Sequence, residues 1–120
     1  MKPEIKEAWV KALRSGEYQQ GKEALRIEDQ YCCLGVLCDI HRKQEQLSNQ
    51  EDWKLVENGF TYIYNGSRET LPRIVTKWAG LEDDDPWFYN EKKFRTDPLS
   101  VLNDEGYTFD DIADLIEKHF

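Results

Sequence analysis

Apolar residues recur with helical spacing near the beginning of the chain, and this pattern predicts an amphipathic helix there. The stripe consists of Ile5, Ala8, Trp9, Ala12 and Leu13. Pro3 suits the first turn, where its missing N–H would have no partner, and Gly16 is the expected left-handed residue after the last turn. Residues 17–30 are mostly polar, and for them we expect a turn at Gln20-Gly21 followed by a short extended piece.

The most apolar stretch of the chain runs from Tyr31 to Ile40, and Asp39 is its one charged residue. Periodicity alone does not separate a buried strand from a buried helix in so short a run. The helical spacing of its apolar residues, and the helix-favouring residues 42–46 that follow, favour a helix. Such a helix is apolar nearly all round and is expected in the middle of the core. Gly35 costs up to about 1 kcal/mol in a helix interior, so it is expected to mark a close backbone contact.

A β-hairpin and a further helix are predicted in the second half of the chain. Residues 53–57 (WKLVE) and 60–64 (FTYIY) are rich in β-forming residues, and Asn58-Gly59 between them is the strongest short signal for a hairpin. After this hairpin, apolar residues return to helical spacing. The expected helix has Pro72 at its start and Gly80 past its end.

Residues 82–98 (EDDDPWFYNEKKFRTDP) show no clear periodicity and are interpreted as a charged and aromatic loop. A loop of this length is uncommon in a compact domain without a functional reason. A short turn is expected around Leu99–Leu102, and then a last helix that begins after Thr108, with Asp111 completing a near capping box. The fold class predicted is α+β: one compact domain over residues 1–120, with about four helices packed on a small antiparallel sheet or hairpin.

Composition supports a globular domain and limits its partners. The chain has 120 residues, and its 4 Trp, 6 Tyr and 5 Phe argue against disorder. Its formal net charge of −8 argues against direct nucleic-acid binding, since Lys and Arg dominate affinity for phosphate backbones. The start of the chain lacks the apolar stretch of a signal peptide, and no run approaches the roughly 20 apolar residues of a membrane span. We therefore expect a cytoplasmic protein that does not act at a membrane.

The negative charge is concentrated near the end of the chain. Residues 1–26 carry six bases and four acids, whereas residues 82–120 carry four bases and twelve acids. The acidic part contains the aromatic triplet Trp87-Phe88-Tyr89. These residues are interpreted either as core residues or as a recognition surface, and the second interpretation rests on the enrichment of aromatic side chains at interface hot spots. An acidic, aromatic surface is suited to a basic partner. The candidate binding residues here are Asp83, Asp84, Asp85, Trp87, Phe88 and Tyr89.

Three cysteines, Cys32, Cys33 and Cys38, lie close together, and their odd number does not fit a disulfide framework. With His41 they offer potential zinc ligands, but the chain has no second ligand pair of the kind that structural zinc sites use. We therefore expect buried free cysteines, no metal and no other cofactor. Phosphate-binding, dinucleotide-binding and serine-nucleophile motifs are also missing, so no catalytic residue is predicted.

Four sequence blocks carry a resemblance to a known family. They are W-x-x-A-L-R-S-G-x-Y at 9–18, YCCLGVLCD at 31–39, L-P-x-x-V-x-x-W-A-G-L at 71–81 and L-N-D-x-G-x-T-F-x-x-I-A-D-L-I at 102–116. With these blocks the chain resembles a family of small uncharacterised proteins from phages and bacteria. The resemblance implies a viral or prophage setting, in which small acidic proteins often inhibit or sequester host components. It supplies no functional residues.

The leading hypothesis is a non-enzymatic, phage-type binding protein in the host cytoplasm. It would inhibit a host protein, for example a defence protein, or sequester a small signalling ligand. For a small anionic ligand the candidate residues are Lys22 and Arg26, beside the cysteine segment. The alternative is a small thiol-dependent enzyme that uses Cys32 or Cys33, because the pKa of a thiol falls at a helix N-terminus.

The cysteine interpretation predicts the metal content of the purified protein. Elemental analysis is expected to show well under one equivalent of zinc, because buried free cysteines act as small apolar side chains. A stoichiometric zinc content would contradict this interpretation.

Overall fold

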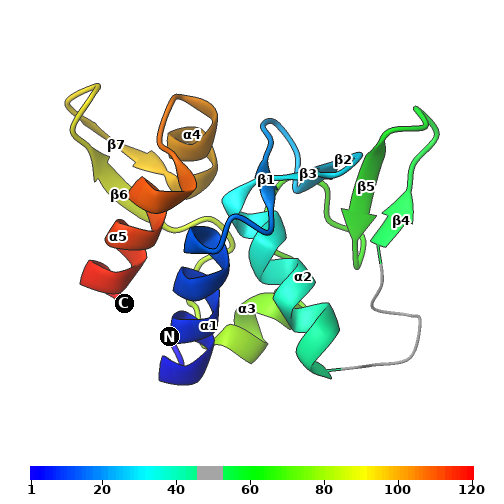
Figure 1. Cartoon of the computed structure of the whole chain (residues 1–120), viewed down its shortest axis with the longest axis horizontal. Coiled ribbons are helices and arrows are strands. Elements are labelled where there is room, and N and C mark those ends of the chain that lie inside the picture. Colours follow the sequence, from blue (N-terminus) through cyan, green and yellow to red (C-terminus); the bar gives the residue numbers. More distant parts are fainter. Residues whose placement is uncertain (46–52) are drawn as a thin grey trace.

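The computed structural model describes residues 1–45 and 53–120, and these contain five helices and seven short strands (Figure 1). The helices are α1 (Pro3–Arg14), α2 (Cys33–Glu45), α3 (Arg73–Ala79), α4 (Leu99–Asp104) and α5 (Phe109–His119). The strands are β1 (Gln19–Gln20), β2 (Arg26–Ile27), β3 (Gln30–Tyr31), β4 (Trp53–Leu55), β5 (Thr61–Tyr64), β6 (Trp87–Asn90) and β7 (Arg95–Pro98). The predicted α+β class is confirmed.

The strands form two separate sheets at opposite ends of the helices (Figure 1). One is a five-stranded sheet in the order β1-β3-β2-β5-β4, in which β1 and β3 are parallel and the other neighbours antiparallel. The other is the two-stranded antiparallel hairpin β6–β7. The predicted small antiparallel sheet is thus a mixed sheet, and a second hairpin accompanies it.

Helix α2 lies in the middle of the core, as its apolar sequence predicts. Its residues from Cys33 to His41 are buried, and it packs against α1, α3 and α4. The helix begins at Cys33 because Tyr31 is already paired in β3, and because the Cys32 sulfur accepts a hydrogen bond from the Gly35 N–H at 3.4 Å. Gln46, the last residue of the predicted helix-favouring stretch, lies outside the residues that the structure describes.

Gly35 marks a close backbone contact, as predicted. A Cβ atom built on Gly35 would lie 1.9 Å from the carbonyl oxygen of Leu25, well inside van der Waals contact. The same carbonyl accepts a hydrogen bond from the Cys32 N–H at 3.1 Å. The first turn of α2 therefore lies directly against the backbone just before β2, and only glycine permits that distance.

A buried amide network ties β1 to three helices. The Asn103 side chain, which is only 1% exposed, accepts from the Cys33 N–H at 3.2 Å and from the Gln20 side chain at 2.9 Å, and it donates to the Gly21 carbonyl at 2.8 Å. Gln20 also donates to the Tyr107 carbonyl and accepts from the Phe109 N–H at 3.1 Å. One pair of side chains thus satisfies backbone groups at the starts of α2 and α5.

Two expectations for residues 82–102 were wrong. The segment interpreted as a loop contains the β6–β7 hairpin, and the turn expected at Leu99–Leu102 is the first part of α4. The hairpin is hard to predict because β7 is the polar segment Arg95–Pro98, which has little β propensity without its partner. Helix α4 has six residues, too few to show a helical period.

The ends of the predicted helices and the first hairpin are confirmed. Gly16 and Gly80 adopt positive φ angles of 79° and 74° after α1 and α3. Thr108 and Asp111 form a full capping box at the start of α5. Strands β4 and β5 pair as predicted around Asn58-Gly59. No helix within residues 1–45 or 53–120 is long and apolar enough to cross a membrane.

Replacing Gly35 by alanine is expected to lower the free energy of unfolding by about 2 kcal/mol or more, because the added Cβ must displace rigid backbone. Urea or thermal unfolding measures the change. Gly16→Ala is the matched control: its φ of +79° is strained for alanine, but the space around it is open, so it is expected to cost about 1 kcal/mol. Equal losses for the two variants would show that the contact with Leu25 has no special weight.

Candidate functional site

The aromatic triplet is split between the surface and the core. Along β6, burial alternates, so that Trp87 and Tyr89 are 62% and 54% exposed on one face, whereas Phe88 is 8% exposed on the other. The Phe88 ring packs against the rings of His119 and Phe120, with centroids 5.4 and 5.6 Å apart. Phe88 is therefore a core residue, whereas Trp87 and Tyr89 are exposed, and a role of these two side chains in recognition stays a prediction.

A third exposed aromatic residue lies on the same hairpin and was missed from the sequence. Phe94, in the connection between β6 and β7, is 82% exposed and has a left-handed backbone with φ of 55°. Its neighbours Lys92, Lys93 and Arg95 are basic. Acidic side chains offset this charge, because Asp111 lies 3.9 Å from Lys92, and Asp97 and Glu105 each lie 3.0 Å from Arg95. Recognition of the hairpin in the sequence would have drawn attention to Phe94, because turn residues of a hairpin are exposed.

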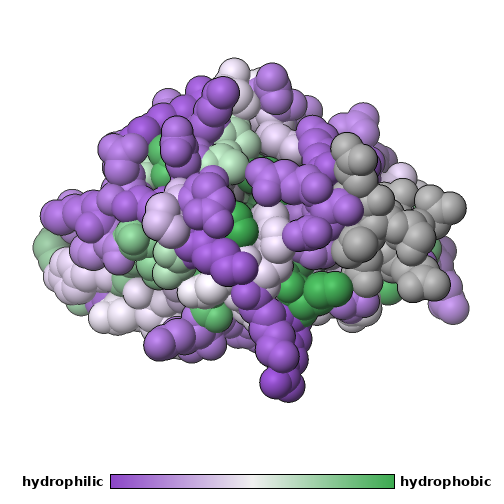
Figure 2. Space-filling model, turned by 90° about the horizontal axis from the view of Figure 1, so that it is seen from below, coloured by the Kyte–Doolittle hydropathy of each residue, from purple (hydrophilic) through white to green (hydrophobic). Residues whose placement is uncertain are grey.

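A groove of about 530 Å³ runs between β6 and the end of α5. Its lining combines aromatic, aliphatic and charged side chains from both elements: Asp83, Pro86, Trp87, Phe88, Tyr89, Glu91, Leu115, Lys118, His119 and Phe120. The groove therefore contains four of the predicted binding residues, Asp83 and the aromatic triplet. The face seen from below is a mixture of hydrophilic and intermediate residues, with its hydrophobic residues in separate patches (Figure 2).

The three acidic candidates have different surroundings. Asp83 and Asp84 are exposed, and the Asp84 carbonyl accepts from the Leu71 N–H at 3.0 Å. Asp85 is half-buried, and its carboxylate accepts hydrogen bonds from the N–H and the hydroxyl of Ser100 at the start of α4. Burial raises the pKa of Asp85 above its ordinary value, although the bonds from Ser100 oppose the shift. The Asp85 carboxylate thus stabilises the start of α4 through its two hydrogen bonds from Ser100.

The two candidate residues for an anionic ligand also differ. Lys22 is exposed in the connection between β1 and β2. Arg26 lies in β2, and its guanidinium group stacks over the ring of Tyr62 at 4.1 Å and approaches the rings of Tyr31 and Trp53. Arg26 is therefore explained as part of the aromatic face of the five-stranded sheet. An anion site at Lys22 and Arg26 stays a prediction, with no contact that supports it.

The three cysteines are buried, as expected, and they are free thiols. Cys32 and Cys33 do lie at the start of α2, but burial raises the pKa of Cys32 to about 12 and raises the pKa values of Cys33 and Cys38 as well. The increase in pKa caused by burial is therefore larger than the decrease expected at a helix N-terminus. At neutral pH all three remain protonated, which is the unreactive form.

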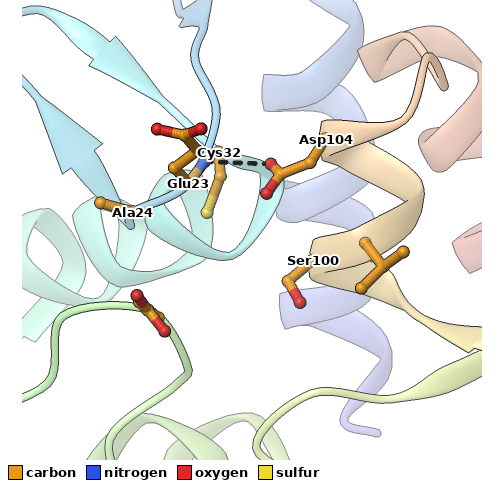
Figure 3. Close-up of a pocket in the computed structure, with 7 residues that line it drawn as sticks. Glu23, Ala24, Cys32, Ser100 and Asp104 are labelled. Carbon is orange, nitrogen blue, oxygen red and sulfur yellow. Dashed lines mark hydrogen bonds between the residues drawn. The ribbon is translucent and has the colours of Figure 1, made fainter.

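Cys32 lies at a second pocket, of about 340 Å³, between α4 and the segment that precedes β2 (Figure 3). Three carboxylates line this pocket, those of Glu23, Glu69 and Asp104, and the Glu23 N–H donates to Asp104 at 3.1 Å. Ser100 contributes a hydroxyl from α4. A pocket with this lining repels anions, so it does not suit the small anionic ligand considered above. Within residues 1–45 and 53–120, no cluster of His, Cys, Asp and Glu is arranged to hold a metal ion.

Asp39 forms a buried ionic centre that the sequence did not reveal. Its side chain accepts from the Tyr18 hydroxyl at 2.6 Å, from Arg42 at 2.9 Å and from the Trp53 indole at 3.0 Å, and Lys43 lies 3.5 Å away. Burial disfavours the charged form, but these hydrogen bonds outweigh it and hold the pKa of Asp39 below its ordinary value. Asp39 thus links α2 to β4 and to the segment before β1, and we assign it a structural role.

One protein family, described as "Domain of unknown function (DUF8296)", matches the chain over residues 1–120, and the chain therefore belongs to this family. No curated protein and no solved structure shows significant similarity to the chain.

The burial of the cysteines predicts their reactivity. At neutral pH, iodoacetamide is expected to modify the native thiols far more slowly than those of the chain unfolded in guanidinium, because the thiolate is the reactive form. Mass spectrometry after timed quenching measures the rates. Fast modification of Cys32 or Cys33 in the folded protein would instead favour the thiol-enzyme hypothesis.

The raised pKa of Cys32 also predicts that the stability of the protein depends on pH. Burial raises the pKa of Cys32 from an ordinary value of 9.0 to about 12 in the folded state, so the unfolded chain loses this proton first. This contribution to the free energy of unfolding is therefore complete below pH 9 and is lost as the pH rises toward 12. Unfolding curves of the wild type and of Cys32→Ala between pH 8 and 11 measure it, and a smaller loss is expected for the variant.

Proposed function

We propose that this chain is a non-enzymatic binding protein that docks on a partner protein through Trp87, Tyr89 and Phe94 of the β6–β7 hairpin. The observation that carries the proposal is the exposure of three large aromatic side chains, 62%, 54% and 82%, on one small hairpin. Exposed aromatic residues that gather at one place are typical of binding hot spots, whereas single exposed apolar residues are common on any protein surface.

The geometry of the hairpin supports this function. Trp87 and Tyr89 alternate with Phe88, whose ring is anchored against Phe120, so the strand that presents them is held in place. A pre-positioned aromatic surface loses little conformational entropy when it binds. Because the groove between β6 and α5 adjoins these side chains, a partner can contact both the outer face of the hairpin and the groove.

A protein partner is preferred to a small anionic ligand. The pocket beside Cys32 is lined by carboxylates, and Arg26 is engaged with aromatic rings, so neither place favours an anion. The net charge of −8 steers the chain toward partners of positive charge over long distances. The partner we propose is a protein with a basic surface and an apolar recess that accepts aromatic side chains.

The thiol-dependent enzyme is the weaker alternative. Its nucleophile would be Cys32 or Cys33, but both thiols are buried, and burial raises their pKa values. His41 lies on α2 eight positions after Cys33, and its ring nitrogen is 2.7 Å from the Tyr64 hydroxyl. A nucleophilic thiol needs a base within hydrogen-bonding distance, and this arrangement does not favour one.

The proposed setting is a phage-infected or prophage-bearing bacterial cell. The four sequence blocks quoted above support it, since they resemble phage and bacterial proteins. In this setting the partner is a cytoplasmic host protein, for example one that acts in defence, and the chain inhibits it by occupying its surface.

Substitution of the hairpin aromatics tests the proposal. The tagged wild-type chain is incubated with a bacterial lysate, and the retained proteins are quantified by mass spectrometry. Trp87→Ser with Tyr89→Ser is expected to reduce the retained partner by about tenfold or more, because a hot-spot residue contributes about 2 kcal/mol or more. The variant is expected to keep the wild-type thermal midpoint, since both side chains are exposed.

The matched control lies at the other end of the molecule. Leu55 and Phe60, beside and within the β4–β5 connection, are 53% and 45% exposed. Leu55→Ser with Phe60→Ser likewise replaces two large exposed apolar side chains and is expected to leave the partner bound. If both double variants lose the partner equally, or if the hairpin variant retains it, the proposed surface is wrong.

A further inference from the structure

Strand β6 pairs with β7 along one edge only. The Leu99 N–H donates to the Pro86 carbonyl at 2.8 Å, and this bond makes Pro86 and Leu99 a hydrogen-bonded pair at the start of the ladder. Hydrogen-bonded and non-hydrogen-bonded pairs alternate along antiparallel strands. Phe88 therefore bonds to β7, whereas the N–H and C=O groups of Trp87 and Tyr89 point away from β7, toward the other edge.

This other edge of β6 borders the groove of about 530 Å³. Leu115, Lys118 and Phe120 line the groove from α5 and from the end of the chain. Figure 1 shows β6 between β7 and α5. Within residues 1–45 and 53–120, no third strand pairs with this sheet. The groove thus has a strand edge as one wall and a helix as the other.

We propose that the open edge of β6 binds an extended segment of the partner protein as a third strand of the β6–β7 sheet. This inference rests on the proposed protein-binding function and specifies how the partner is held. Two N–H and two C=O groups, from Trp87 and Tyr89, line the edge, and an extended peptide backbone presents donors and acceptors with the same spacing.

The side chains of the added segment alternate between the two faces of the sheet. Those on one face contact the exposed rings of Trp87 and Tyr89, and those on the other point into the groove toward Leu115 and Phe120. The segment is therefore expected to have apolar residues at alternating positions. Backbone bonds supply affinity, and the groove selects the sequence.

Charge favours a different protein over a second copy of this chain as the occupant. Pairing of two identical edges would bring together two molecules that each carry a net charge of −8, and this repulsion opposes self-association. A segment from a basic partner meets attraction instead. A dimer in solution whose interface includes β6 would overturn the proposed occupant, and sedimentation of the wild type and of Tyr89→Pro detects it.

Proline substitutions distinguish the contribution of the backbone N–H groups at this edge from the contribution of the side chains. Tyr89→Ala removes the ring and keeps the outward N–H, whereas Tyr89→Pro removes both and leaves the bonds to β7 intact. Thr96→Pro is the matched control, because Thr96 lies opposite Tyr89 and its N–H points to the outer edge of β7. Circular dichroism and thermal unfolding establish that each variant is folded.

The probe is a linear peptide selected against the wild-type chain from a library of random sequences, and its affinity is measured by fluorescence polarisation. Tyr89→Pro is expected to bind about tenfold more weakly than Tyr89→Ala, because one backbone hydrogen bond is lost and its acceptor is left unpaired. Thr96→Pro is expected to bind like the wild type. Equal affinities of Tyr89→Pro and Tyr89→Ala would overturn strand addition.

Hydrogen exchange measured by NMR gives a second readout that does not depend on any substitution. The amides of Trp87 and Tyr89 are expected to exchange rapidly in the free protein and slowly once the peptide is bound, while the amide of Thr96 stays unchanged. Unchanged exchange at Trp87 and Tyr89 would overturn the proposal. If no peptide is selected, but Trp87→Ser with Tyr89→Ser still loses the lysate partner, strand addition fails and the proposed binding function stands.

Discussion

The structure depends on the buried side chain of Asn103. Its oxygen accepts from the first N–H of α2, and its nitrogen donates to the Gly21 carbonyl, so that one amide connects α4 to α2 and to the end of β1. Gln20 extends the connection to the start of α5. Without these bonds, several backbone groups would be buried without partners, and each of them costs about 1–3 kcal/mol. Helices α2, α4 and α5 are therefore held together by one shared hydrogen-bond network, the Asn103 network.

The Asn103 network also positions the proposed binding surface. The hairpin leads directly into α4 through Leu99, and Phe88 packs on the end of α5 through Phe120. Both helices meet at the Asn103 network, so this network holds the base of the hairpin in place. The other end is organised differently: the Asp39 carboxylate gathers Tyr18, Arg42 and Trp53, and the sheet packs around these aromatic side chains.

Residue types that are close together in the sequence predicted the parts of the fold that depend on interactions between neighbouring residues, such as the ends of the helices. Gly16 and Gly80 end helices because a left-handed residue costs glycine little, and Thr108 with Asp111 starts one because their side chains satisfy free N–H groups. The apolar run that became α2 was predicted as a buried helix, and Gly35 was predicted to mark a close contact. Its partner, the Leu25 carbonyl, was not predictable, since the two residues meet only after the chain folds.

The sequence by itself determined an α+β domain, its main helices, its acidic charge and the presence of aromatic residues in the segment 82–98. Tertiary structure alone decided that this segment is a hairpin, because β7 is polar and becomes a strand only when it pairs with β6. It also decided which aromatic side chains are exposed. Trp87 and Tyr89 face outward and Phe88 inward because α5 covers one face of the strand, and no local pattern specifies which face a distant helix covers.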